Sequence, residues 1–153
     1  PGRFTEFSGK IELDEKNITK STVDFSVNVA SITTSVSKRD DHLRSADFFD
    51  ATKFPKATFT STMIKNSGSG YAVTGDLTIR DVTKKLTLQA KNVGKVEDPM
   101  SKTWKYVFSA TGKINRKDFG VNYGPDAVVG DNVDLWINLE LAEPAAPAAA
   151  ATK

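Results

Sequence analysis

The sequence contains no cysteine, one histidine and two methionines among its 153 residues. Without cysteine the chain has no disulfide framework, no thiol nucleophile and no thiolate metal ligand. A single histidine also argues against a transition-metal site, and the residue spacing of a calcium-binding loop is absent. We therefore expect neither a metal nor another cofactor.

The sequence also has little net charge and no long hydrophobic run. Lys and Arg number 21 against 19 Asp and Glu, a net charge of +2 with no clustered basic face, so a nucleic-acid partner is not expected. No stretch approaches the roughly 18 to 20 consecutive apolar residues of a membrane-spanning helix. The short run Gly68-Ser69-Gly70 lies in a hairpin signal and not between a strand and a helix, so it does not indicate a phosphate-binding loop.

The sequence does contain nine phenylalanines and a strong alternation of apolar and polar residues. Alternation with a period of two predicts strands that have one dry and one wet face. The short connections between segments favour antiparallel neighbours, and the strand length of about nine to eleven residues favours a tall up-and-down barrel. Seven segments show the pattern: Phe4–Leu13, Thr22–Val29, Ala57–Asn66, Tyr71–Arg80, Val82–Lys91, Trp104–Asn115 and Val133–Leu141.

Residues 37–54 break the alternation. Ser37 followed by Asp40 has the spacing of a capping box, which predicts a short helix over Lys38–Arg44, with a second turn near Ala46–Phe49. Phe48, Phe49 and Phe54 follow closely, so the segment is a candidate lid over one mouth of the barrel. A plainer alternative is that the same rings only cover a filled barrel end.

The two ends of the chain have different compositions from the centre. Residues 143–153 form an Ala- and Pro-rich stretch that cannot bury enough surface to order itself, so we expect one domain over residues 1–142 and a disordered tail. The chain opens on Pro1-Gly2-Arg3 without an initiator Met or a signal peptide, which predicts a domain truncated at its N-terminus.

Three stretches, in order along the chain, resemble motifs of the YceI-like domain family. They are Arg39–Asp50 followed by Phe54-Pro55 and Ala57–Ser61, then Thr74–Lys84, then Thr111–Val121. The resemblance implies a lipocalin-like eight-stranded barrel that carries a polyisoprenoid or another long-chain amphiphile, such as an isoprenoid quinone or a fatty acid, in an elongated tunnel. It also implies periplasmic or secreted proteins that often form homodimers. The family's first strand normally precedes the stretch that Gly2-Arg3-Phe4 matches, so this chain should have seven strands and an open seam.

Together these arguments predict a binding protein and not an enzyme. Two residues are candidates for contact with a ligand headgroup, His42 and Arg116, although the run Arg116-Lys117-Asp118 also fits a plain solvated turn. The predicted ligand-contacting residues are Phe25, Val27, Phe48, Phe49, Phe54, Phe59, Leu77, Ile79, Leu88, Tyr106, Phe108, Leu135 and Ile137.

Three alternatives remain open at this point. The protein could act on a lipid headgroup at the barrel mouth, using His42 with Asp40 or Asp41 as acid and base. It could be a stress-related structural protein with a filled core. The alternating strands would also suit a transmembrane barrel, although the polar faces carry many Lys and acidic residues and the aromatics form no two girdles.

Overall fold

The main element of the computed structural model is one antiparallel sheet, and the structure describes residues 1–125 and 127–142. Within that range the sheet has seven strands in the order β2-β3-β5-β6-β7-β8-β9. Each predicted strand has its counterpart in the sheet, while the predicted tail lies outside the described residues. The strands are β2 (Phe7–Glu12), β3 (Thr22–Asn28), β5 (Lys56–Ser67), β6 (Gly70–Ile79), β7 (Val82–Glu97), β8 (Trp104–Asn115) and β9 (Asn132–Ala142).

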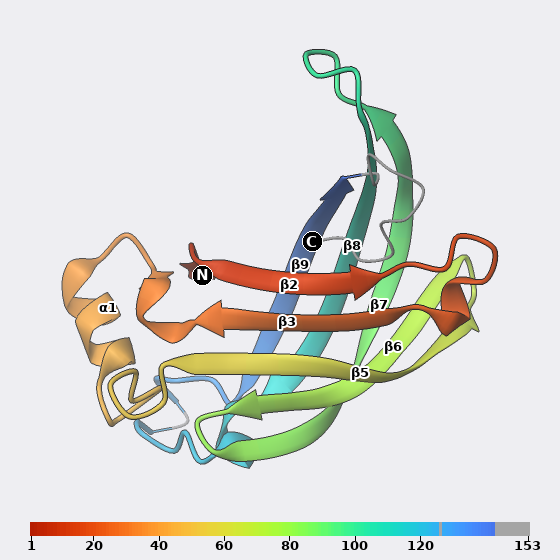
Figure 1. Cartoon of the computed structure of the whole chain (residues 1–153). Coiled ribbons are helices and arrows are strands. Elements are labelled where there is room, and N and C mark those ends of the chain that lie inside the picture. The colour runs from red at the N-terminus through yellow and green to blue at the C-terminus, as the bar shows by residue number, and fades with distance from the viewer. Residues whose placement is uncertain (126, 143–153) are drawn as a thin grey trace.

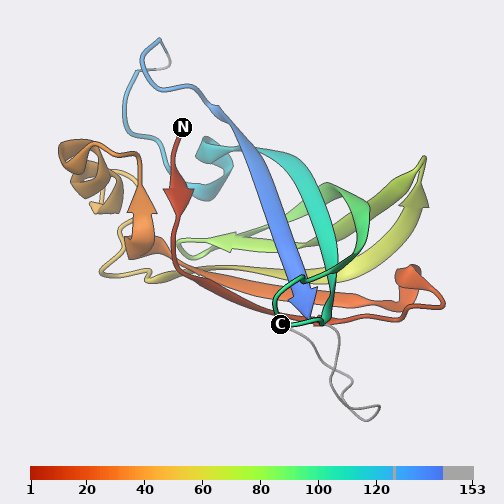
Figure 2. The same cartoon turned by 90° about the horizontal axis from the view of Figure 1, so that it is seen from above.

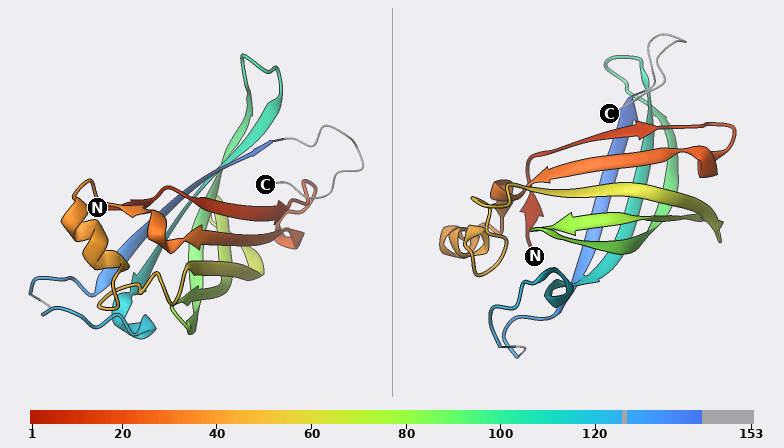
Figure 3. Two further views of the ribbon diagram at one scale, coloured as in Figure 1. Left: turned by 60° about the vertical axis from the view of Figure 1, so that its left-hand side comes forward. Right: turned by 60° about the horizontal axis from the view of Figure 1, so that its bottom comes forward.

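The sheet curls so that its two halves face each other. In Figure 1 strands β2, β3, β5 and β6 form the near wall, and β7, β8 and β9 cross behind them at a steep angle; the views in Figures 2 and 3 show the same curl. Among the described residues no ladder joins the edge strands β2 and β9. The predicted lipocalin-like antiparallel fold is therefore confirmed, as a curled sheet with one open seam.

The first predicted strand is divided into two. β1 (Arg3–Phe4) leaves the main sheet and pairs with β4 (Ile32–Thr33), and β2 begins only at Phe7. The break occurs because Ser31 binds the backbone N–H groups of the two residues between β1 and β2. Its carbonyl accepts from Thr5 N–H at 3.2 Å, and its hydroxyl accepts from Glu6 N–H at 3.0 Å. Alternation alone gave no sign of this local competitor.

Strand β7 is longer than predicted, because a β-bulge interrupts its alternation. The register with β8 shifts between Asn92 and Gly94, after which pairing continues to Glu97. After a bulge, the residues that faced outward in the alternation face inward. The apolar alternation therefore ended at Ala90, although the strand itself continues. The predicted two-residue turn between β6 and β7 is present, with Arg80 at φ 57° and its guanidinium donating to the Gly120 carbonyl at 3.1 Å.

The predicted helix is α1 (Ser37–Arg44), but the predicted capping box is wrong. The helix begins one residue earlier, and its N-cap, Val36, makes no side-chain capping bond. The Asp40 carboxylate turns back to Thr34 instead, accepting from its backbone N–H at 2.7 Å and its hydroxyl at 2.6 Å. These bonds, that of the Thr34 hydroxyl first, lower the pKa of Asp40 and bind the helix to the chain before it.

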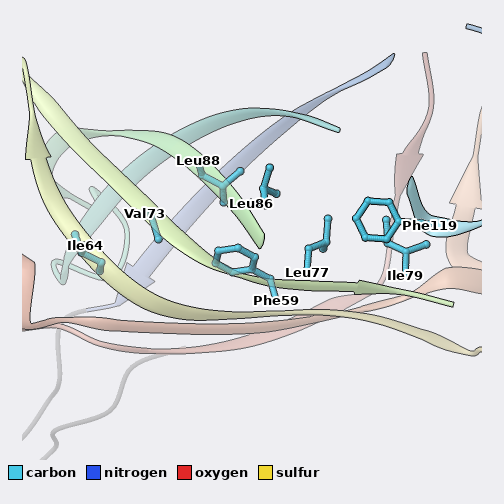
Figure 4. Packing of buried hydrophobic residues seen from close by; sticks show 8 residues of the cluster. All are labelled: Phe59, Ile64, Val73, Leu77, Ile79, Leu86, Leu88 and Phe119. Carbon is cyan, nitrogen blue, oxygen red and sulfur yellow. The ribbon is translucent and has the colours of Figure 1, made fainter. Parts of the chain in front are cut away.

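The described part of the chain also has three short 3₁₀ turns: η1 (Ile18–Lys20), η2 (Val29–Ser31) and η3 (Arg116–Phe119). The turn η3 places Phe119, which is 3% exposed, on the core cluster inside the sheet. Figure 4 shows the cluster running from Ile64 and Val73 to Ile79 and Phe119. The core is therefore filled at the Phe119 end of the sheet.

Candidate functional site

A hollow with apolar walls lies at the other end of the sheet's inner face. Its cavity volume is about 80 Å³, and the whole hollow measures about 650 Å³ when the space open to solvent is included. Strands β2, β3, β5, β6, β7, β8 and β9 and the turn η1 all contribute to its wall. The lining residues are Ile11, Leu13, Ile18, Ser21, Val23, Phe25, Phe59, Ile64, Tyr71, Val73, Leu88, Ala90, Phe108, Ser109, Ala110, Ile137 and Leu139.

Strand register explains why this wall is apolar. Ala90, Ala110 and Ile137 occupy one row across β7, β8 and β9, because each pairs with the next. On the facing wall Phe25 pairs with Phe59, and their rings stack with centroids 5.2 Å apart. Small side chains on one wall and stacked rings on the other leave the space between them unfilled.

The structure brings five of the predicted ligand-contacting residues to the hollow: Phe25, Phe59, Leu88, Phe108 and Ile137. Leu77 and Ile79 are buried in the core cluster, and Leu135 packs against it. Val27 and Tyr106 do not line the hollow either. The predicted set thus has the right face of the sheet but extends into the filled end.

Several lining residues were missing from the prediction. Val73, Ala110 and Leu139 lie on the same alternating faces as residues that were chosen, so the pattern could have identified them. Ile64 is different, because the register shift between Ser61 and Met63 brings it to the face that Phe59 occupies. Ile18 could not be found this way, because it belongs to η1, in a region that carries only turn signals. Its place in the wall depends on how the β2–β3 connection folds over the sheet.

The three rings of the predicted lid have three different surroundings. Phe49 packs against the core cluster and meets Phe4 edge-to-face at 5.9 Å. The Phe54 ring is covered by the guanidinium of Arg80, 5.6 Å from its centroid. The Phe48 ring contacts His42 at 5.0 Å and Tyr123 at 5.4 Å. None of the three lines the hollow, so they cover the filled end and not the hollow's opening.

His42 does not join the carboxylates that sequence reasoning paired with it. Its Nε2 lies 2.8 Å from the Asp47 carboxylate, and its ring is 4.8 Å from that of Tyr123. Asp41 instead accepts from Arg44 at 3.0 Å, and Asp40 is engaged with Thr34. His42 therefore belongs to a contact between α1 and the loop after η3, away from the hollow.

Arg116 is buried at 6% exposure, so its interpretation as a solvated turn residue is wrong. Its guanidinium donates to four carbonyls of the following loop and to one carboxylate. The acceptors are Gly130 O, Val121 O, Tyr123 O, Val129 O and the Asp131 carboxylate, at 2.7 to 3.4 Å. A guanidinium has five N–H groups, and these five bonds leave none for a ligand headgroup.

Tyr106 lies beside the hollow, one inward position beyond Phe108 on β8. Its hydroxyl donates to the carboxylate of Glu15, which belongs to the connection between β2 and β3. This bond, together with burial, raises the pKa of Tyr106. The phenol is therefore a neutral hydrogen-bond donor at physiological pH.

In residues 1–125 and 127–142 no three His, Asp or Glu side chains converge as metal ligands would. That part of the chain also has no helix long and apolar enough to cross a membrane.

The curled antiparallel sheet and its apolar interior define a lipocalin-like barrel of the kind used by binding proteins. The sequence model of the YceI-like domain matches residues 1–141. The chain belongs to the YceI-like domain family. It is similar to Protein YceI of Shigella flexneri, with 44% identity over 141 residues, 91% of this chain and 72% of the relative.

Two solved structures are similar throughout the fold. The YceI protein of Campylobacter jejuni shares 32% identity with a TM-score of 0.85, over 94% of this chain and 85% of that one. BcnA of Burkholderia cenocepacia shares 26% identity with a TM-score of 0.82, over 91% of this chain and 86% of that one.

Proposed function

We propose that this protein binds and carries a long-chain hydrophobic ligand, such as a polyisoprenoid, an isoprenoid quinone or a fatty-acid-like amphiphile, with its chain in the hollow. The observation that carries the proposal is the composition of the wall. Apart from Ser21, Tyr71 and Ser109, every lining side chain is a hydrocarbon. Each methylene that a ligand buries against such a wall contributes about 0.8 kcal/mol to the binding free energy, so few polar contacts are needed.

The size of the hollow limits how such a ligand can lie. A cavity volume of about 80 Å³ is small beside the roughly 300 to 1,000 Å³ of ordinary ligand pockets. A long chain therefore inserts one part into the cavity and continues through the open part of the hollow. The seam between β2 and β9 has no ladder among the described residues, and it offers that continuation without breaking sheet hydrogen bonds.

Catalysis at a lipid headgroup has less support. It required His42 to work with Asp40 or Asp41, whereas His42 is paired with Asp47 and lies away from the hollow. The filled-core alternative agrees with the Phe119 end of the sheet but not with the unfilled end. We also propose a periplasmic or secreted location, which rests on the family resemblance alone and is tested by fractionating cells that express the gene.

Calorimetric titration with octanol, decanol, dodecanol and hexadecanol tests the binding proposal. Affinity should rise with chain length by about 0.8 kcal/mol per methylene for as long as added methylenes enter the hollow. Affinity that is absent, or that does not change with chain length, would contradict it.

A further inference from the structure

The β-bulge in β7 places a lysine on the inner face of the sheet. Before the bulge Ala90 pairs with Ala110, and both line the hollow. After the register shift between Asn92 and Gly94, Lys95 pairs with Tyr106. Without the bulge the alternation from Ala90 would have put Lys95 on the outer face. Bulges of this kind re-aim side chains near functional sites.

Lys95 is the centre of a polar cluster on an otherwise apolar surface. Its ammonium lies 5.3 Å from the centre of the Tyr106 ring and 5.6 Å from that of Trp104. The Tyr106 hydroxyl adds a second donor, and it donates a hydrogen bond to the Glu15 carboxylate. A carboxylate, a cation and a phenol donor thus meet where β7, β8 and the β2–β3 connection come together.

This cluster stands at the rim of the hollow. Phe108 is the next inward residue of β8 and lines the wall, as do Leu13 and Ile18 on either side of Glu15 in the chain. Leu141, opposite Tyr106 on β9, is 2% exposed and continues the apolar surface to the cluster. A chain lying in the hollow with its polar end outward would bring that end to Lys95 and Tyr106.

We propose that Lys95 and Tyr106 form the headgroup site for an anionic amphiphile, a long chain ending in a carboxylate or a phosphate, and that Glu15 occupies the place of that anion until the ligand enters. The inference rests on the proposed function, which does not itself specify a charged head. Glu15 is exposed and lies in a connection, not in a strand, so it can leave without disturbing the sheet. An entering anion would take over the bond to Tyr106 and the attraction to Lys95, both stronger for a charged than for a neutral acceptor.

The alternative is that Glu15 and Tyr106 only hold the β2–β3 connection closed. Calorimetry with hexadecanoate, hexadecyl phosphate and hexadecanol distinguishes the two, since the probes share a chain and differ in the head. Lys95→Met and Tyr106→Phe should each weaken at least one anionic probe roughly tenfold and leave hexadecanol unchanged. Glu15→Gln should tighten the same probe about threefold, because the competing anion is gone. Lys113→Met, on the outer face beside Asp134, removes the same charge and should change nothing.

Quenching of tryptophan fluorescence by brominated ligands tests directly where the ligand headgroup lies. In a Trp136→Phe background, which removes the 82% exposed indole of β9, Trp104 is the remaining tryptophan and can be excited selectively. A hexadecanoic acid with bromine beside its carboxylate should quench Trp104 strongly. The same acid with bromine at the far end of the chain should quench it weakly.

The outcomes separate this inference from the proposed function. If no probe binds the unmodified protein, both are wrong. If hexadecanol binds but the substitutions shift acid and alcohol equally, or the two bromo acids quench alike, only the headgroup site is wrong. The anionic probe that responds identifies the head as a carboxylate or a phosphate.

Discussion

Filling the hollow from its own wall should strongly weaken ligand binding while it stabilises the fold. Ala110 lies in the middle of β8, lines the hollow, and is flanked by Ala90 and Ile137 on the neighbouring strands. Ala110→Leu adds three carbon atoms on this inner face. They occupy the space that the first methylenes of a ligand would use.

The expected magnitudes follow from the volume and from the number of carbons. A ligand that loses contact for three methylenes loses about 2 kcal/mol of binding free energy, roughly 30-fold in Kd. Filling the cavity volume of about 80 Å³ corresponds to at most about 2 kcal/mol of added stability, because empty core space costs about 24 cal/mol per Å³. A side chain that did not fit would instead cost about 1 to 3 kcal/mol through overpacking.

The assay is calorimetric titration with dodecanol, combined with urea denaturation of the same samples. Ala72→Leu is the matched control, because Ala72 lies between the inward residues Tyr71 and Val73 on β6 and so faces outward. The reasoning would be refuted if Ala110→Leu folded at wild-type stability or better and still bound dodecanol with unchanged affinity. Equal loss of binding in Ala72→Leu would refute it too.

Three further predictions concern the residues around the filled end. Arg116→Met should lower the free energy of unfolding by about 3 to 5 kcal/mol in urea, since it leaves buried acceptors unpaired; a loss below about 1 kcal/mol would contradict the buried role. Asp40→Asn should lower the melting temperature at neutral pH. The lowered pKa means that this stabilisation is present above the unfolded-state value near 3.8 and is lost as pH falls through the folded-state value, so wild type and variant should converge in strong acid; a gap that does not change with pH would count against it. His42→Ala should lower the free energy of unfolding by about 1 kcal/mol, because its ring contacts with Phe48 and Tyr123 are lost, and should leave dodecanol binding unchanged. A loss of dodecanol binding would show that His42 belongs to the ligand site.

Much of the sheet could be predicted because alternation is a local signal. Val133–Leu141 and Trp104–Asn115 keep apolar residues at nearly every second position, and the structure has both strands within a residue of those limits. The prediction failed where a local hydrogen bond or a bulge changes the period. Ser31 divided the first strand, and the bulge near Gly94 concealed the end of β7. The alternation of the residues that precede each break gives no sign of either one.

The site was less predictable, because the sequence identifies the inner face but not which part of it is left unfilled. Leu77 and Leu88 are equally apolar, yet only Leu88 lines the hollow. The difference comes from Phe119, which η3 folds onto the Leu77 end of the sheet through contacts distant in sequence. Arg116 was misjudged for the same reason, since the carbonyls that surround it belong to a loop that the alternation does not describe.

Organic extraction of the freshly purified protein, followed by mass spectrometry, tests the account most directly. A long-chain hydrophobic compound should be recovered in amounts approaching one per chain, and at a much lower level from Ala110→Leu prepared in parallel. Recovery of no such compound from the unmodified protein, combined with failure to take up any long-chain probe added afterwards, would contradict it.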